Sequence, residues 1–91
     1  MIGSSYQKLI ISQSEKQITL LGYPLELTDA EYAIVTLLHA EGGASRQRLG
    51  DICPMQSIPV HVCNINRKSR RITQRPLIVF GEGVYRINEN L

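Results

Sequence analysis

The sequence predicts an α+β fold with short N-terminal strands, three helices and a C-terminal β-hairpin. Three observations predict this order. Short apolar runs separated by turn residues occupy positions 6–27. Apolar residues then recur at helical spacing in three segments, and two strand-like runs near the C-terminus flank a glycine-rich turn. At 91 residues, we expect one domain over residues 1–91.

The strands of the 6–27 region are expected at Leu9–Ile11, Ile18–Leu21 and Leu25–Leu27. The segments between them, residues 12–16 and 22–24, contain the Ser, Gly and Pro residues that favour turns.

The first helix is predicted over residues 29–41. Thr28 and Glu31 have the spacing of a capping box, in which each side chain bonds the other's backbone N–H. Gly42 and Gly43 end the segment, because glycine adopts the positive φ common at helix ends. The apolar residues that share one face of this helix are Ala30, Ile34, Leu37 and Leu38.

A second helix is predicted over 46–53, with Ser45 as its cap and Pro54 as its end. A third is predicted over 58–72, capped by Ser57, with Pro59 tolerated in the first turn. An inward apolar stripe on this third helix consists of Ile58, Val62, Ile65, Ser69 and Ile72. Its opposite face carries Val60, Cys63, Asn64, Arg67, Arg70, Arg71 and Gln74.

The hairpin is predicted over 77–87, with strands at Leu77–Phe80 and Val84–Ile87 joined through Gly81–Gly83. Strands, three helices and then a hairpin is the order of a winged helix, in which the third helix precedes the β-wing. The third helix is therefore the candidate recognition helix.

Charge is divided unevenly along the chain. Residues 1–45 carry a net charge of −3 and residues 46–91 a net charge of +5, although the whole chain has only +2. Such asymmetry indicates a surface that binds a polyanion. The alternative is a solvated helix face, since Lys and Arg near a helix C-terminus also interact favourably with the helix dipole.

The chain resembles the DNA-binding domain of OmpR/PhoB-type response regulators over nearly its whole length. The motifs that carry the resemblance are Leu27-Thr28-x-x-Glu31-Tyr32, Gly43 with Ser45-Arg46 and Leu49, Val60-His61-Val62 with Ile65 and Arg67-Lys68, and Gly83-Val84-Tyr85-Arg86-Ile87. The resemblance implies a winged helix preceded by a small antiparallel sheet. It also implies sequence-specific binding of double-stranded DNA in transcription regulation, with the third helix in the major groove and the wing near the backbone or minor groove.

The expected contacts come partly from residue chemistry and partly from the resemblance. Asn64 can pair with adenine and Arg67 with guanine through two hydrogen bonds each, and the clustered basic residues suit phosphates. The resemblance adds contacts from Val60, His61, Cys63 and Asn66. The candidate DNA-binding residues are Ser57, Val60, His61, Cys63, Asn64, Asn66, Arg67, Lys68, Arg70, Arg71 and Arg75.

The partner expected first is a DNA duplex bound by two copies on neighbouring half-sites, because one small module buries limited surface. The resemblance implies a tandem, head-to-tail arrangement. The family usually has arginines where Cys63, Asn64 and Asn66 stand. That departure leaves open a second reading, an interaction module whose Val60 and asparagine-rich face binds RNA polymerase or a regulator.

Other function classes find little support in the sequence. It contains no arrangement typical of a catalytic triad, a carboxylate pair or a phosphate-binding glycine loop, so we expect no enzyme activity. Cys53, His61 and Cys63 lack the spacing of a metal site, and we expect neither metal nor cofactor. The apolar runs are too short for a membrane span, which indicates a cytoplasmic protein. Two cysteines are too few for a disulfide framework, so we expect both thiols to be reduced.

Overall fold

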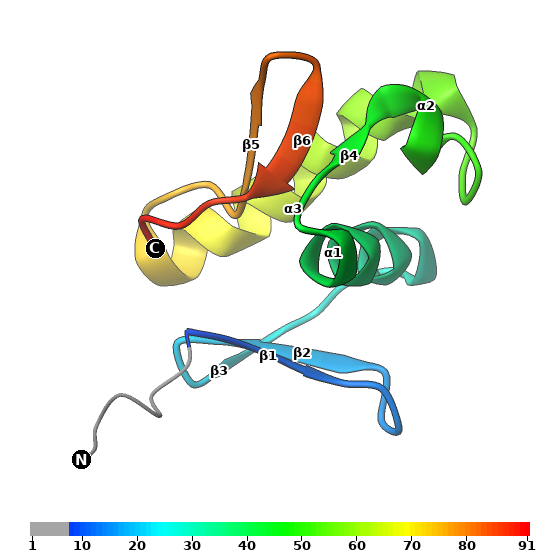
Figure 1. Cartoon of the computed structure of the whole chain (residues 1–91). Helices are drawn as coiled ribbons and strands as arrows, with labels where there is room; N and C mark the ends of the chain where they lie inside the picture. Colours follow the sequence, from blue (N-terminus) through cyan, green and yellow to red (C-terminus); the bar gives the residue numbers. More distant parts are fainter. Residues whose placement is uncertain (1–7) are drawn as a thin grey trace.

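A computed structural model of the chain describes residues 8–91 and confirms the α+β winged-helix fold (Figure 1). The first residues of the expected strand region, Tyr6 and Gln7, lie outside the described residues. The elements in chain order are β1 (Leu9–Ser12), β2 (Gln17–Leu20), β3 (Tyr23–Leu25), α1 (Asp29–Glu41), β4 (Ala44–Ser45), α2 (Arg46–Leu49), a 3₁₀ turn (Met55–Ser57), α3 (Ile58–Thr73), β5 (Ile78–Gly81) and β6 (Val84–Ile87).

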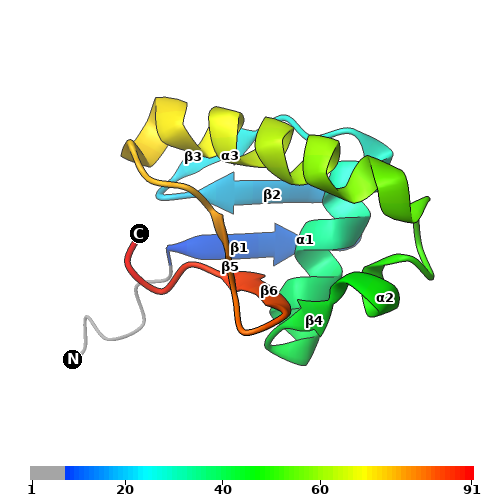
Figure 2. The ribbon, with the colours of Figure 1, turned by 90° about the horizontal axis from the view of Figure 1, so that it is seen from above.

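The elements lie in layers around α1. The antiparallel sheet β1-β2-β3 lies on one side of α1, and α3 lies with the β5–β6 hairpin on the other (Figure 1). Seen from above, α3 runs lengthwise over the sheet, and the hairpin lies next to it at an angle to the helix (Figure 2). The buried hydrophobic residues form one cluster between these layers: Ile18, Leu20, Leu25, Ile34, Val35, Leu38, Ala44, Leu49, Cys53, Ile58, Ile65, Leu77 and Ile78.

The third strand is Tyr23–Leu25, whereas the sequence predicted Leu25–Leu27 and a turn over residues 22–24. The chain reverses instead at Leu21–Gly22, where both residues have positive φ (52° and 85°). This is the φ pattern of a two-residue type I′ hairpin loop. The next residue therefore already pairs with β2, as Tyr23 opposite Leu20.

Helix α1 begins with both bonds of the capping box. The Glu31 N–H donates to Thr28 Oγ1 at 3.2 Å, and the Thr28 N–H donates to Glu31 Oε1 at 3.1 Å. The helix ends at Gly42, whose φ of 74° turns the chain and whose N–H donates to the Leu38 carbonyl. Local chemistry therefore sets both ends of the helix.

Helix α2 ends at Leu49, four residues before the predicted end at Cys53. Ser45 does cap it, since its Oγ accepts the Arg48 N–H at 3.1 Å. After Leu49 the backbone tightens into turns, with the Ile52 N–H bonded to the carbonyl three residues earlier. Gly50 is a poor helix former, and the tight turns replace helix before Pro54 is reached.

The chain between α1 and α2 forms β4, which the sequence did not predict. Ala44 pairs with Tyr85 and Ser45 with Val84, which gives the second sheet the order β4-β6-β5. Gly43 has a φ of 139°, and a Cβ built on it would lie 3.1 Å from Val84 Cγ1. Glycine is therefore needed at the position where this segment meets β6.

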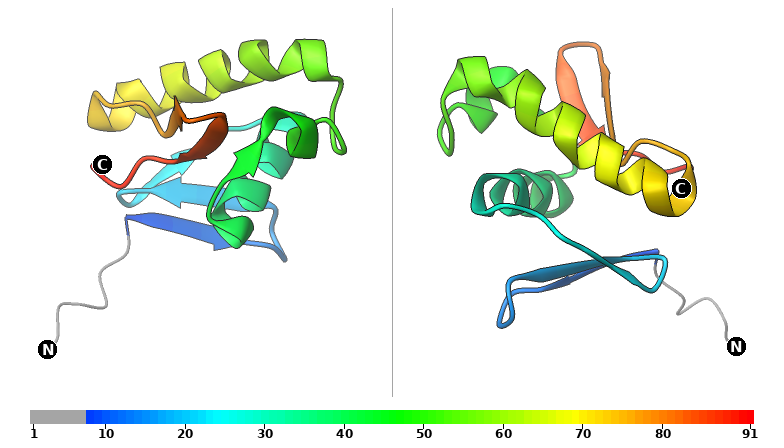
Figure 3. Two further views of the ribbon diagram at one scale, coloured as in Figure 1. Left: turned by 45° about the horizontal axis from the view of Figure 1, so that its top comes forward. Right: turned by 180° about the vertical axis from the view of Figure 1, so that it is seen from behind.

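Helix α3 starts without a side-chain cap, which corrects the role expected for Ser57. Ser57 has helical φ and ψ and belongs to the preceding 3₁₀ turn, so its side chain is not placed to accept a first-turn N–H. The wing reverses at Glu82–Gly83, both with positive φ, while Gly81 lies within β5. Figure 3 shows the resulting hairpin beside α3.

Candidate nucleic-acid interface

The outer face of α3 is the side opposite its buried residues, and it is exposed. Ile58, Ile65 and Ser69 point into the core, at the spacing that keeps side chains on one face of a helix. The outer face consists of Val60, Cys63, Arg67, Arg70 and Arg71, all of them exposed. Five of the expected contact residues therefore lie on one surface.

This outer face is basic, and within residues 8–91 its arginines form no ion pair with a carboxylate. No Asp or Glu occurs within α3. The ion pairs found in residues 8–91 involve Arg48 and Lys68 instead. Arg70 and Arg71 lie in the last turn, where the helix dipole favours positive charge. The guanidinium groups of the outer face are thus available to an anionic ligand such as a phosphate backbone.

Ser57 and Arg75, which flank the two ends of α3, differ in their exposure to solvent. Ser57 is half-buried at the start of the helix. Arg75 is exposed just after the helix, and its backbone is held in place by hydroxyl groups. The Arg75 carbonyl accepts hydrogen bonds from Ser69 Oγ at 2.8 Å and from Thr73 Oγ1 at 3.1 Å. Arg75 is therefore an exposed cation next to the C-terminal end of α3, which carries Arg70 and Arg71.

His61 and Asn64 lie on the flank of α3 that also carries Lys68. Residues separated by three, four and seven positions share one side of a helix, so His61, Asn64 and Lys68 follow one another along this flank. All three are half-buried. Asn64 borders the outer face, which leaves it accessible from the same side as Arg67.

Lys68 is engaged within the protein. Its Nζ lies 2.6 Å from Glu31 Oε1, and the Glu31 side chain is 3% exposed. The same Glu31 oxygen accepts the Thr28 N–H in the capping box. Lys68 therefore connects α3 to the start of α1, and the ammonium that was expected to contact DNA is bound to Glu31 instead.

Asn66 is also engaged within the protein, on the flank facing the wing. Its Nδ2 donates to the Ile78 carbonyl at 3.1 Å, and its Oδ1 accepts the Ile78 N–H at 2.9 Å. The side chain thus spans from the middle of α3 to the first residue of β5. The contact with a base expected for Asn66 competes with these two bonds.

The wing carries an exposed aromatic side chain and an acidic tip. Phe80 on β5 is 60% exposed, and its ring lies 4.6 Å from that of Tyr85 on β6. Glu82 is exposed at the turn. Phe80 was not among the residues predicted for the site. Strand alternation places it on the same face as the buried Ile78. Only the extension of the hairpin beyond the body exposes it.

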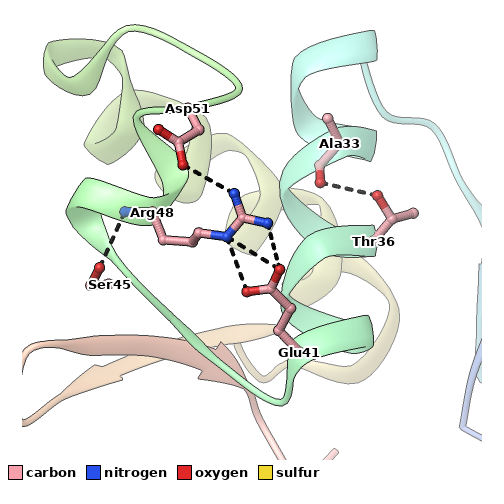
Figure 4. A network of polar contacts seen from close by, with 6 residues as sticks. All are labelled: Ala33, Thr36, Glu41, Ser45, Arg48 and Asp51. Carbon is pink, nitrogen blue, oxygen red and sulfur yellow. Dashed lines mark hydrogen bonds and ion pairs between the residues drawn. The ribbon is translucent and has the colours of Figure 1, made fainter.

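Arg48 joins the end of α1 to α2 (Figure 4). Its Nη2 lies 2.6 Å from Glu41 Oε2, and its Nη1 lies 3.0 Å from Asp51 Oδ2. The hydrogen bond from Arg48 lowers the pKa of Glu41, and the same bond is the main cause that raises the pKa of Arg48. This cation is used within the protein rather than offered to a ligand.

The two cysteines occupy different environments. Cys53 is buried, its Sγ contacts the Leu49 carbonyl at 3.6 Å, and burial raises its pKa. Cys63 is exposed on α3. In residues 8–91, no three His, Cys, Asp or Glu side chains gather in a way that could hold a metal ion. Over the same residues, no helix is long and apolar enough to cross a membrane.

Comparison with known proteins finds similarity at the level of structure. No protein-family profile and no curated protein matches the chain. The DNA-binding domain of the response regulator AdeR, solved in complex with an intercistronic region, superposes with a TM-score of 0.77 at 20% identity, covering 91% of this chain and 95% of that one.

A second solved structure, from a family of redox sensors in the streptococci evolved from two-component response regulators, gives the same TM-score of 0.77 at 18% identity. It covers 99% of this chain, which spans 43% of that protein's length. At these identities the likeness concerns the fold. The chain has the winged-helix fold of response-regulator DNA-binding domains, as the sequence predicted.

Proposed function

We propose that this domain binds double-stranded DNA in a sequence-specific manner and acts in transcription regulation, with α3 in the major groove. The observation that carries the proposal is the outer face of α3, on which exposed arginines without carboxylate partners lie next to a β-wing. A major groove is wide enough to admit an α-helix. The proposed role is binding without a catalytic step, in the cytoplasm.

The proposed DNA interface, which is the outer face together with Asn64 and Arg75, divides into a base-reading part and a phosphate-binding part. Arg67 can donate two hydrogen bonds to a guanine edge, and Asn64 beside it can pair with adenine. Val60 and Cys63, one turn earlier, are small enough to permit close approach and contact with a thymine methyl group. Towards the C-terminal end of α3, we assign Arg70, Arg71 and Arg75 to the phosphate backbone.

The wing contributes beside the helix, near the backbone or the minor groove. Glu82 repels phosphates at the tip, so attraction by charge does not explain a contact there. Phe80 offers an exposed apolar ring on β5. Apolar side chains are inserted between base pairs by several minor-groove proteins. We therefore assign the wing contact to Phe80 rather than to a cation.

One module of this size buries limited surface on DNA, and stable specific binding is favoured by two copies on neighbouring half-sites. The similarity to response-regulator domains supports a tandem arrangement of these copies. This part of the proposal predicts two half-sites of the same orientation in a selected sequence.

A second candidate function is the binding of a regulator or of RNA polymerase. The observation that favours it is a set of exposed apolar side chains at the start of α3 and in the loop before it: Ile52, Met55 and Val60. In this candidate function, these exposed side chains would supply the apolar contact with the partner protein. In this reading, the arginines only keep the helix surface soluble.

Selection of bound sequences from random duplexes tests the proposal, followed by titration of variants. On the selected site, Asn64→Ala and Arg67→Ala should each cost about 1 to 3 kcal/mol, with much smaller losses on a scrambled duplex. Arg71→Ala should weaken binding to both duplexes about equally. Lys16→Ala removes an exposed cation from the turn between β1 and β2 and serves as the charge control.

Two results would contradict parts of the proposal. Equal losses on both duplexes for Asn64→Ala and Arg67→Ala would refute direct reading of bases and leave DNA shape as the source of specificity. If no duplex is bound even at low salt, DNA binding is refuted and the protein-partner function is favoured.

A further inference from the structure

Asn66 and Ile78 form a closed pair of hydrogen bonds between α3 and β5, at 3.1 Å and 2.9 Å. A carboxamide carries a donor and an acceptor side by side, so one side chain satisfies both the N–H and the C=O of one backbone residue. A neighbouring strand would make the same kind of contact. Asn66 thus takes the place of a strand partner for β5.

The edge position of β5 explains why this partner is needed. β5 pairs with β6 on one side, and in the order β4-β6-β5 no strand of residues 8–91 lies on its other side. The Ile78 groups that reach Asn66 point away from β6, as the alternation of an antiparallel pair requires. Ile78 is 3% exposed, and buried backbone groups without a partner are costly. The two hydrogen bonds from Asn66 satisfy the backbone N–H and C=O of Ile78 at the edge of β5 and attach β5 to α3.

The pair lies where the two proposed DNA-contacting elements diverge. Asn66 directly precedes Arg67 on α3, and Ile78 is the first residue of the strand that leads to the wing tip. A second asparagine, Asn88, holds the base of the hairpin by donating to the carbonyls of Leu77 and Pro76 at 2.7 Å and 2.9 Å. That contact joins the two ends of the hairpin to each other, whereas Asn66 joins the hairpin to α3.

We propose that Asn66 is a positioning residue, which fixes the orientation of the wing relative to α3 so that both elements meet one duplex at a defined spacing. The inference rests on the proposed DNA binding and assigns Asn66 an indirect part in it. Affinity depends on such pre-organisation, because an element that is ordered only on binding loses part of the interaction energy.

The structural part of the inference is tested without DNA. Residual dipolar couplings measure the orientation of β5–β6 relative to α3 in the wild type, Asn66→Ala and Asn66→Gln. Asn66→Gln keeps both polar groups on a longer arm and guards against a simple loss of folding by the alanine variant. Both variants should reorient or spread the wing, and the Ile78 amide should exchange faster with solvent. Asn64→Ala is the control: Asn64 has no hydrogen bond to β5 among those of residues 8–91, so this variant should leave the orientation of the wing unchanged.

The functional part compares two duplexes, one spanning the full wild-type footprint and one trimmed so that the wing meets no DNA. Asn66→Ala should bind the long duplex about tenfold more weakly, as expected for two lost hydrogen bonds. On the short duplex, the affinity of Asn66→Ala should fall by less than about twofold relative to the wild type. Equal losses on both duplexes would overturn the positioning role and indicate direct contact.

The two parts separate failure of this inference from failure of the proposed function. An unchanged wing orientation in both Asn66 variants overturns the inference, whatever the DNA affinities of the variants are. A wild-type protein that binds no duplex refutes the proposed function, while the dipolar couplings still decide whether Asn66 fixes the wing.

Discussion

Replacing Lys68 with methionine tests whether this cation stabilises the fold or contacts DNA. The Lys68–Glu31 pair is 2.6 Å long, with Glu31 3% and Lys68 31% exposed in their side chains. Removal of one partner from a fully buried pair costs about 3–5 kcal/mol, and an exposed pair contributes at most about 1 kcal/mol. Since water reaches Lys68 but not the carboxylate, we expect a loss between these limits, about 2 kcal/mol.

Urea unfolding followed by far-UV circular dichroism measures this loss, because the chain contains no tryptophan to serve as a fluorescent probe. A loss of about 2 kcal/mol also corresponds to a fall in Tm of about 10 °C for a domain of this size. Arg70→Met is the matched control, since it removes an equal charge from an exposed position of the same helix. It should change stability by less than about 0.5 kcal/mol.

Coupling with Glu31 identifies the partner. The double variant Lys68→Met/Glu31→Gln should lose about 1 kcal/mol less unfolding free energy than the two single variants lose together. In DNA titrations at several salt concentrations, Arg70→Met should flatten the slope by about 0.9, and Lys68→Met should leave it unchanged. The reasoning is refuted if Lys68→Met costs no more stability than Arg70→Met, or if it flattens the salt slope equally.

Three further predictions concern stability. Thr28→Ala should lower the unfolding free energy by about 1 kcal/mol because it removes the helix cap, while Thr28→Ser should keep most of the capping stabilisation. Equal urea midpoints for the wild type and the alanine variant would mean that the cap does not stabilise α1. Gly43→Ala should destabilise the fold more than Gly83→Ala. Both glycines have positive φ, but only at position 43 does the new Cβ lie near another side chain, 3.1 Å from Val84 Cγ1. Similar melting temperatures for the two variants would show that Val84 moves to accommodate the methyl group. The pKa of Glu41 is lowered from 4.5 by its hydrogen bond to a guanidinium, so its stabilising effect is complete above about pH 4.5 and is lost as the pH falls through the lower folded-state value. Glu41→Gln should therefore weaken the dependence of stability on pH below 4.5, and acid titrations with the same dependence as the wild type would contradict this.

The local chemistry of the chain determined its helices and their order. Thr28 and Glu31 satisfy each other's backbone N–H groups within one turn, and Gly42 follows with the positive φ that ends the helix. The apolar spacing of α3 similarly determined which side is buried, and with it the exposure of Arg67 and Arg70. These features depend on residues at most a few positions apart, so the sequence shows them directly.

Pairing between distant segments was not visible in the sequence. β4 has only two residues, Ala44 and Ser45, and becomes a strand because Tyr85 and Val84 lie beside it. The exposure of Phe80 likewise depends on how far the hairpin extends beyond the body, since its place in the strand pattern matches that of a buried residue. Neither feature has a local signal, because each is decided by segments that meet only in the folded chain.

The candidate site shows the same division. The sequence by itself determined that α3 is amphipathic, with a basic face, and that it precedes a hairpin. Only the tertiary structure decided that Lys68 pairs with Glu31, 37 positions away, and that Asn66 holds Ile78, 12 positions away. The physical reason is that a polar residue on the flank of a helix can face either solvent or a neighbouring element. Which of the two it meets depends on how the helix packs against α1 and the wing, and no local pattern records that packing.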